Sequence, residues 1–222
     1  MTEPLTKVRR IGVLHHGTEA TARAVDTEAA LAANDEVTAA IASTEALESA
    51  CEAVLAAVGH PRSDDRPLVR RLSRDPVTAP WCDLVSRLLS RPGAALAAER
   101  LRVAGLLLSW ATVEGWFGRL DELPAPPERV GGDGPRRSPF ATPVRLLHGW
   151  ALIGHGRDVE VSERALRVWR ELDGRPLGEV LEALRRFDPR ERPEDTAATV
   201  TWLLRHGLVE APSRTASRAL PR

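Results

Sequence analysis

The chain has 222 residues, of which 43% are hydrophobic and 28% charged, so it can bury one good core or two small ones. Its 31 basic and 31 acidic residues cancel, and without excess positive charge neither nucleic acid nor an anionic membrane is an expected partner. The longest nearly apolar run, residues 103–113, is far shorter than the ~20 residues of a membrane helix. Cys51 and Cys82 are too few for a disulfide framework or a zinc site. We therefore expect a cytoplasmic protein with reduced, buried thiols.

The amino-terminal part is predicted to be helical after one short strand. Residues 7–14 (KVRRIGVL) favour the strand, and the pattern of residues 18–58 favours two helices that break near Asn34. Asp35 and Glu36 follow Asn34 as expected of a cap with acids in the first helical turn. One face of the second helix is expected to collect its apolar side chains, which are Val37, Ile41, Leu47, Cys51, Val54, Leu55 and Val58.

Acidic side chains dominate the same two helices. Residues 18–58 contain Arg23 as their one basic residue. Two interpretations stay open: the acidic face is a solvated helix surface, or it docks a basic partner. The acidic residues are Glu19, Asp26, Glu28, Asp35, Glu36, Glu45, Glu48 and Glu52.

Two more helices complete the predicted bundle of residues 1–123. They span residues 80–90 and 94–120, and the second is the most strongly periodic segment of the chain. Trp110 and Trp116 are expected in the core rather than in a binding site. The inward residues are Trp81, Leu84, Val85, Leu88 and Leu89 in the first helix, and Leu96, Val103, Leu106, Leu107, Trp110, Val113, Phe117 and Leu120 in the second.

A segment rich in Pro and Gly, PAPPERVGGDGPRRSPFATP (residues 124–143), follows the bundle. It has almost no apolar periodicity, so a linker or long surface loop is expected, with residues 136–139 as a solvated loop. At the carboxy terminus, residues 211–222 are expected to form a flexible tail, and no second wing strand is expected beyond Val209.

Residues 144–210 are predicted to place strands before three helices. Residues 144–153 are β-prone and residues 158–161 alternate polar and apolar, so a hairpin or small meander is expected, with a turn between them. Helix signals follow in order: Ser162 as a cap, a stop at Asp173-Gly174, a second start at Pro176, a third start at Pro193 and a stop at Gly207.

The predicted fold is thus mainly α with a small β-sheet, an N-terminal helical bundle joined to a C-terminal winged-helix-like module. Many winged helices bind DNA, and their third helix enters the major groove. Here that helix begins Glu194-Asp195-Thr196, and residues 144–210 carry eleven Arg against twelve acidic side chains. Such a module gains little from counterion release on DNA. A transcriptional regulator therefore remains only an alternative.

The run DVEVSERALRVWRELDGRPLGEVLEAL, followed by TAATVTWLLRHGLVEA, resembles the PqqD-like modules known as RiPP recognition elements. The matching features are the strand that leads into a helix, the turn and second helix of LDGRPLGEVLEAL, and the closing LLRHGLV, which together cover a third of the chain. Members of that family hold leader peptides for peptide-modifying enzymes. The leader adds as a strand beside the last strand of the sheet and packs over the third helix. The resemblance therefore implicates residues 158–161 and the exposed side of the helix that holds Trp202.

The third helix supports this site independently. At about 100° per residue, Asp195, Thr199, Trp202 and His206 cluster away from the apolar stripe of that helix. An indole outside a core stripe is enriched at interfaces, although the amino-terminal bundle is an alternative cover for it. The predicted peptide-binding residues are Asp158, Val159, Glu160, Val161, Asp195, Thr199, Trp202 and His206.

These observations predict a non-catalytic accessory protein that binds a leader or precursor peptide by strand addition. It would present the peptide to a modifying enzyme within a heterodimer. The layout is similar to the partner proteins of multinuclear iron peptide-modifying oxidases, whose catalytic metal belongs to the other chain.

A stand-alone enzyme is the second alternative. The chain lacks HExxH, CxxC, GxSxG, GxGxxG and P-loop motifs. His15 and His16 follow the expected first strand, and in a strand they would point to opposite faces. One of them could join a site with Glu19 or with an acid elsewhere in space, an alternative that stays open. We otherwise expect no catalytic residue, metal ligand or cofactor in this chain.

Overall fold

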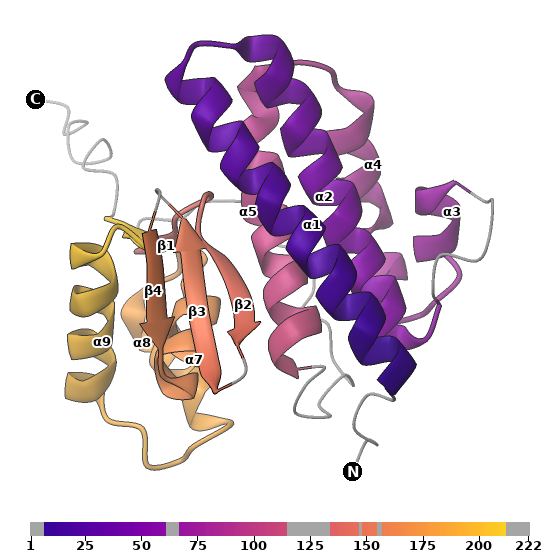
Figure 1. Cartoon of the computed structure of the whole chain (residues 1–222). Helices are drawn as coiled ribbons and strands as arrows, with labels where there is room; N and C mark the ends of the chain where they lie inside the picture. Colours follow the sequence, from indigo (N-terminus) through magenta and orange to yellow (C-terminus); the bar gives the residue numbers. More distant parts are fainter. Residues whose placement is uncertain (1–6, 61–66, 115–133, 147, 155–156, 212–222) are drawn as a thin grey trace, which may run out of the picture.

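The computed structural model describes residues 7–60, 67–114, 134–146, 148–154 and 157–211 (Figure 1). In these residues the chain is mostly helical with a small antiparallel sheet, which confirms the predicted fold class. A helix with the length and apolar character needed to cross a bilayer is not found among them.

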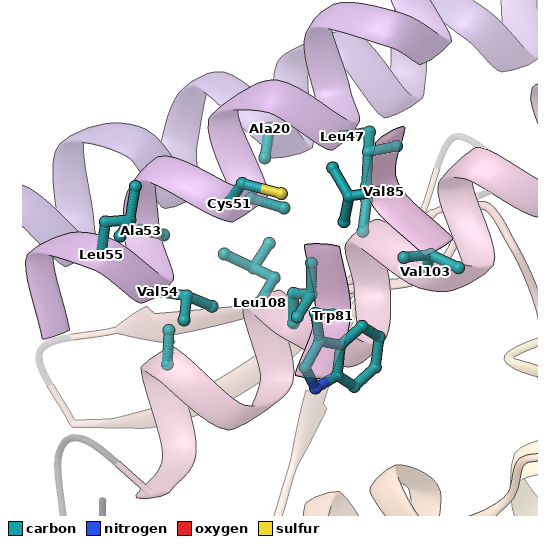
Figure 2. Packing of buried hydrophobic residues seen from close by; sticks show 14 of the residues in the cluster. Ala20, Leu47, Cys51, Ala53, Val54, Leu55, Trp81, Val85, Val103 and Leu108 are labelled. Carbon is teal, nitrogen blue, oxygen red and sulfur yellow. The ribbon is translucent and has the colours of Figure 1, made fainter. Parts of the chain in front are cut away.

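The amino-terminal part forms a helical bundle around one apolar core. Figure 2 shows Leu47, Cys51, Trp81, Val85 and Leu108 meeting there from separate segments of the chain. Each of these side chains is at most 1% exposed. The elements of the bundle are α1 (Lys7–Ala32), α2 (Glu36–Val58), α3 (Leu68–Leu72), the 3-10 helices η1 (Ala79–Trp81) and η2 (Ala94–Leu96), α4 (Cys82–Ser90), α5 (Ala97–Ser109) and the π-helical turn η3 (Trp110–Glu114).

Helices α1 and α2 form an antiparallel hairpin that breaks where the sequence predicted (Figure 1). Asn34 adopts the left-handed region with φ 56°, and Asp35 caps α2 by accepting a hydrogen bond from the Thr38 amide at 3.0 Å. The strand predicted for residues 7–14 is wrong, because this segment is the start of α1. It packs closely on α2: a Cβ added to Gly12 would lie 2.9 Å from the Cβ of Ala56. Tertiary packing therefore overrides the local strand preference.

The remaining bundle helices largely follow the predicted pattern. The helix expected at residues 80–90 is η1 with α4, and the one expected at residues 94–120 is seen as η2, α5 and η3. Residues 115–120, with Trp116, Phe117 and Leu120, lie outside the described residues. Helix α3 was not predicted. Val37 and Ile41 were expected in the core but are 71% and 55% exposed.

The carboxy-terminal module begins with an antiparallel meander. Its strands β2 (Thr142–Leu146), β3 (Gly149–Gly154) and β4 (Arg157–Val161) lie in the order β2-β3-β4, so β4 is an edge strand. Trp150 pairs with Val161 across β3 and β4. Three helices then follow, as predicted: α7 (Glu163–Glu171), α8 (Leu177–Arg185) and α9 (Pro193–Arg205). Ser162 caps α7 by accepting a hydrogen bond from the Ala165 amide at 3.1 Å.

Residues expected in the linker and at the end of the module form a second small sheet. Strand β1 (Arg136–Arg137) pairs with β5 (Val209–Glu210), and neither strand was predicted. The solvated loop expected at residues 136–139 is wrong, because Arg137 is only 5% exposed and donates a hydrogen bond to the Arg170 carbonyl. This burial lowers the pKa of Arg137 to about 10. The division of the chain at residues 124–143 stays a prediction.

The module meets the bundle through one edge of its sheet. Strand β2 packs against α1 and α5, and Phe140 packs against Ala24, Ala46 and Leu101 of the bundle. An ion pair of 3.1 Å between Arg102 and Glu210 adds a polar contact. Helix α9 packs on α7, α8 and β5, and it lies on the side of the module away from the bundle (Figure 1). Strand β4 and helix α9 are thus both remote from the bundle.

Candidate functional site

A groove of about 380 Å³ lies between the edge strand β4 and helix α9. Five of the eight residues predicted to bind a peptide line it, namely Glu160, Val161, Asp195, Thr199 and Trp202. The structure therefore brings residues from two distant segments of the sequence to one surface. The other lining residues are Ser162, Arg164, Ala165 and Ala198.

The other three predicted residues lie beside the groove or away from it. Val159 is half-buried and packs against the core of the module. The ring of His206 lies over that of Trp202, with centroids 4.2 Å apart. Asp158 is exposed and pairs with Ile153 in the sheet, and it is not among the residues that line the groove.

Strand β4 supplies one wall of the groove because of its place in the sheet. It pairs with β3 on one side, and within the described residues no strand pairs with its other side. An edge strand of this kind presents backbone N–H and C=O groups that another extended chain can pair with. Ser162 then turns the chain directly into α7, which places Arg164 and Ala165 in the groove.

Trp202 is the largest apolar group in the groove. Its side chain is half-buried and packs against the core of the module, while part of it faces the groove. His206, one turn later, places its Nδ1 2.9 Å from the Trp202 carbonyl, so the ring is oriented if Nδ1 carries the proton. The described part of the bundle contributes no residue to the groove, and α9 lies on the far side of the module from it (Figure 1).

A polar network joins two elements that line the groove. The Arg164 guanidinium donates to both Glu191 oxygens at 2.5 and 3.2 Å and to the Thr199 hydroxyl at 2.7 Å. Burial raises the pKa of Glu191, but hydrogen bonds from Arg164 and Thr196 outweigh this effect and hold the pKa below its usual range. The network links α7 to α9. Sequence reasoning missed Arg164, since nothing local indicates a partner 27 residues away.

The groove continues past the end of β4 towards the turn between β2 and β3. A second cavity of about 660 Å³ shares Glu160, Val161 and Ser162 with it. The two spaces therefore adjoin at the end of β4. The remaining lining residues of this cavity are Leu146, His148, Gly149 and Trp150.

Exposed carboxylates stand on both walls of the groove. Glu194 and Asp195 are exposed in the first turn of α9. A DNA-reading helix needs basic or hydrogen-bond-donating side chains at this position. Glu160 adds a third exposed carboxylate on the opposite wall.

Comparison of the chain with protein-family models, with curated proteins and with solved structures finds no match.

Proposed function

We propose that this chain is a peptide-binding accessory protein, and that the peptide lies in the groove between β4 and α9. The observation that carries the proposal is the open edge of β4 beside the half-buried indole of Trp202. A strand edge alone can pair with any extended chain. The indole favours a peptide that places an apolar side chain against it. The resemblance of residues 158–210 to leader-binding modules supports the same occupant.

The peptide would bind by strand addition. Its backbone pairs with the free N–H and C=O groups of β4, and alternate side chains then point towards α9, because successive residues of a strand face opposite sides. Trp202 provides the apolar contact on that side. Glu160 and Asp195 stand on opposite walls, so a peptide with basic residues near its apolar anchor gains electrostatic complementarity.

The second proposed partner is the enzyme that modifies the bound peptide. We place this chain in the cytoplasm as the non-catalytic subunit of a heterodimer. Its role there is to hold and present the precursor, as in the partner proteins of multinuclear iron oxidases, with the catalytic metal in the other chain.

The first test is panning of a random peptide library against the full chain. An enriched peptide is synthesised with a fluorescent label, and its dissociation constant is measured by anisotropy. We expect Trp202→Ala to weaken binding by about 2 kcal/mol or more, as truncation of a central interface aromatic does, while the protein still unfolds cooperatively. The matched control is Leu177→Ala, which removes an apolar side chain that is 39% exposed on α8. Equal affinity of wild type and Trp202→Ala for every enriched peptide would refute the site.

A second measurement tests the strand geometry. Methylation of the peptide nitrogens that face β4 should abolish binding, whereas methylation of the intervening nitrogens should be tolerated, because an antiparallel ladder uses alternate residues of the strand. Tolerance of both methylation patterns would exclude backbone pairing with β4.

A further inference from the structure

Helix α1 places three side chains with metal-binding atoms together, far from the groove in sequence. The His15 Nε2 lies 3.5 Å from one Glu19 oxygen, and the His16 Nδ1 lies 3.1 Å from the other. The two imidazole centroids are 4.9 Å apart. In a strand, which the sequence favoured just before them, His15 and His16 would have pointed to opposite faces. The α-helix instead brings both beside Glu19.

Helix geometry explains this arrangement. At 100° per residue, Glu19 is one turn further along α1 and falls about 40° from His15 on one side and about 60° from His16 on the other. The carboxylate therefore lies between the two imidazoles. One ligand atom from each of the three residues lies within 4.8 Å of the others.

These separations are close to those that one ion requires. Ligand atoms bound at about 2.0–2.2 Å to a tetrahedral zinc are about 3.3 Å from one another, and the two His–Glu distances are 3.1 and 3.5 Å. Rotation of the Glu19 and His15 side chains is enough to bring all three ligand atoms to such separations, because these two side chains are 46% and 63% exposed. His16, at 9% side-chain exposure, is held by packing. One ligand is thus preorganised and two can adjust.

The donor set indicates which kind of ion fits. Imidazole nitrogens favour zinc, copper, iron and nickel over calcium and magnesium, which prefer oxygen ligands. Three protein ligands leave at least one coordination position open to solvent, whereas a structural zinc site is closed by four. We propose that His15, His16 and Glu19 bind one divalent transition-metal ion of the zinc type, with water in the remaining positions. This proposal does not depend on the peptide groove.

Zinc binding to the full chain tests this proposal. The untagged protein is dialysed against EDTA, transferred to a chelator-free buffer and titrated with Zn²⁺ by calorimetry, with Ca²⁺ as the comparison ion. We expect one equivalent of Zn²⁺ and no measurable Ca²⁺ binding. His15→Ala and Glu19→Gln should each weaken Zn²⁺ binding at least about tenfold, the lower end of what even an outer-shell partner contributes.

The matched control is His60→Ala. His60 lies 3.1 Å from Asp75, which resembles the His16–Glu19 pair, but among the residues that the structure describes no third ligand completes a cluster there, so this variant should bind Zn²⁺ like the wild type. His15 and Glu19 are exposed enough that their variants fold, and circular dichroism verifies this. Absence of Zn²⁺ binding, or binding that survives both His15→Ala and Glu19→Gln, would overturn the proposal. Loss of binding in His60→Ala would also overturn it by locating the ion elsewhere.

Discussion

Some single residues form buried interactions that the local sequence pattern does not predict. Glu52 was counted with the acidic face of the first two helices, yet it is only 8% exposed. Its carboxylate pairs with the Arg71 guanidinium at 2.5 and 2.7 Å. The partner is 19 residues away, so the helical pattern could not distinguish this buried acid from its solvated neighbours. Val37 and Ile41 show the converse error, since they follow an apolar pattern and remain exposed.

The pair of Glu52 and Arg71 leads to a prediction about stability. Arg71→Ala should lower the free energy of unfolding by about 3–5 kcal/mol, because it leaves an uncompensated carboxylate in the interior. Chemical denaturation measures this change. The control is Arg23→Ala, which removes an ion pair of 2.8 Å with Glu45 whose side chains are 49% and 43% exposed, and which should cost at most about 1 kcal/mol. Similar losses for the two variants would contradict the role assigned to burial.

The two thiols also differ at this scale. Burial raises the pKa of Cys51 far above its ordinary value, and Cys51 is fully buried while Cys82 is half-buried. Since the thiolate is the reactive form, we expect Cys51 to resist alkylation by iodoacetamide in the native protein and to react only after unfolding. Mass spectrometry of the alkylated chain checks this. Labelling of Cys51 as fast as of Cys82 under native conditions would show that the core opens readily.

Elements were predictable where their ends carry local chemical signals. Ser162, Pro193 and Gly207 mark helix boundaries in the module, and the helices begin and end near them. The period-two pattern of residues 158–161 likewise identified β4. The pairing of β1 with β5 joins residues 136–137 to residues 209–210, and two-residue strands have no period to detect. The walls of the groove could therefore be predicted, but the Arg164 network between them could not.

The start of α1 shows how packing decides the identity of an element. A methyl group at Gly12 would meet Ala56 at 2.9 Å, so Gly12→Ala should destabilise the protein by about 1–3 kcal/mol through overpacking, despite the better helix propensity of Ala. The same substitution at Gly178 in α8, where a Cβ would meet nothing within 4 Å, should be neutral or stabilising by up to about 1 kcal/mol. Urea unfolding of both variants makes the comparison. If Gly12→Ala is as stable as Gly178→Ala, the contact between α1 and α2 is looser than described.

At the scale of the whole molecule, the bundle and the groove occupy opposite edges of one small sheet. Strand β2 contacts α1 and α5, while β4, with β3 between them, remains open beside α9 (Figure 1). The bundle therefore supports the module without covering the groove. The acidic face of the bundle stays available as a solvated surface or a docking surface, the two interpretations that the sequence left open.

This separation predicts that the contact with the bundle can be weakened without loss of peptide binding. Phe140→Ala removes the side chain that packs against Ala24, Ala46 and Leu101, so amide exchange in β2 and α5 should become faster, because fewer apolar contacts protect them. The affinity for a peptide enriched on the wild-type protein should stay unchanged, since none of the residues that line the groove contributes to that apolar cluster. Hydrogen exchange with mass spectrometry and fluorescence anisotropy give the two readouts.

Unchanged exchange in β2 would show that Phe140 does not hold the module to the bundle. A fall in peptide affinity would instead show that the bundle sets the shape of the groove through the sheet.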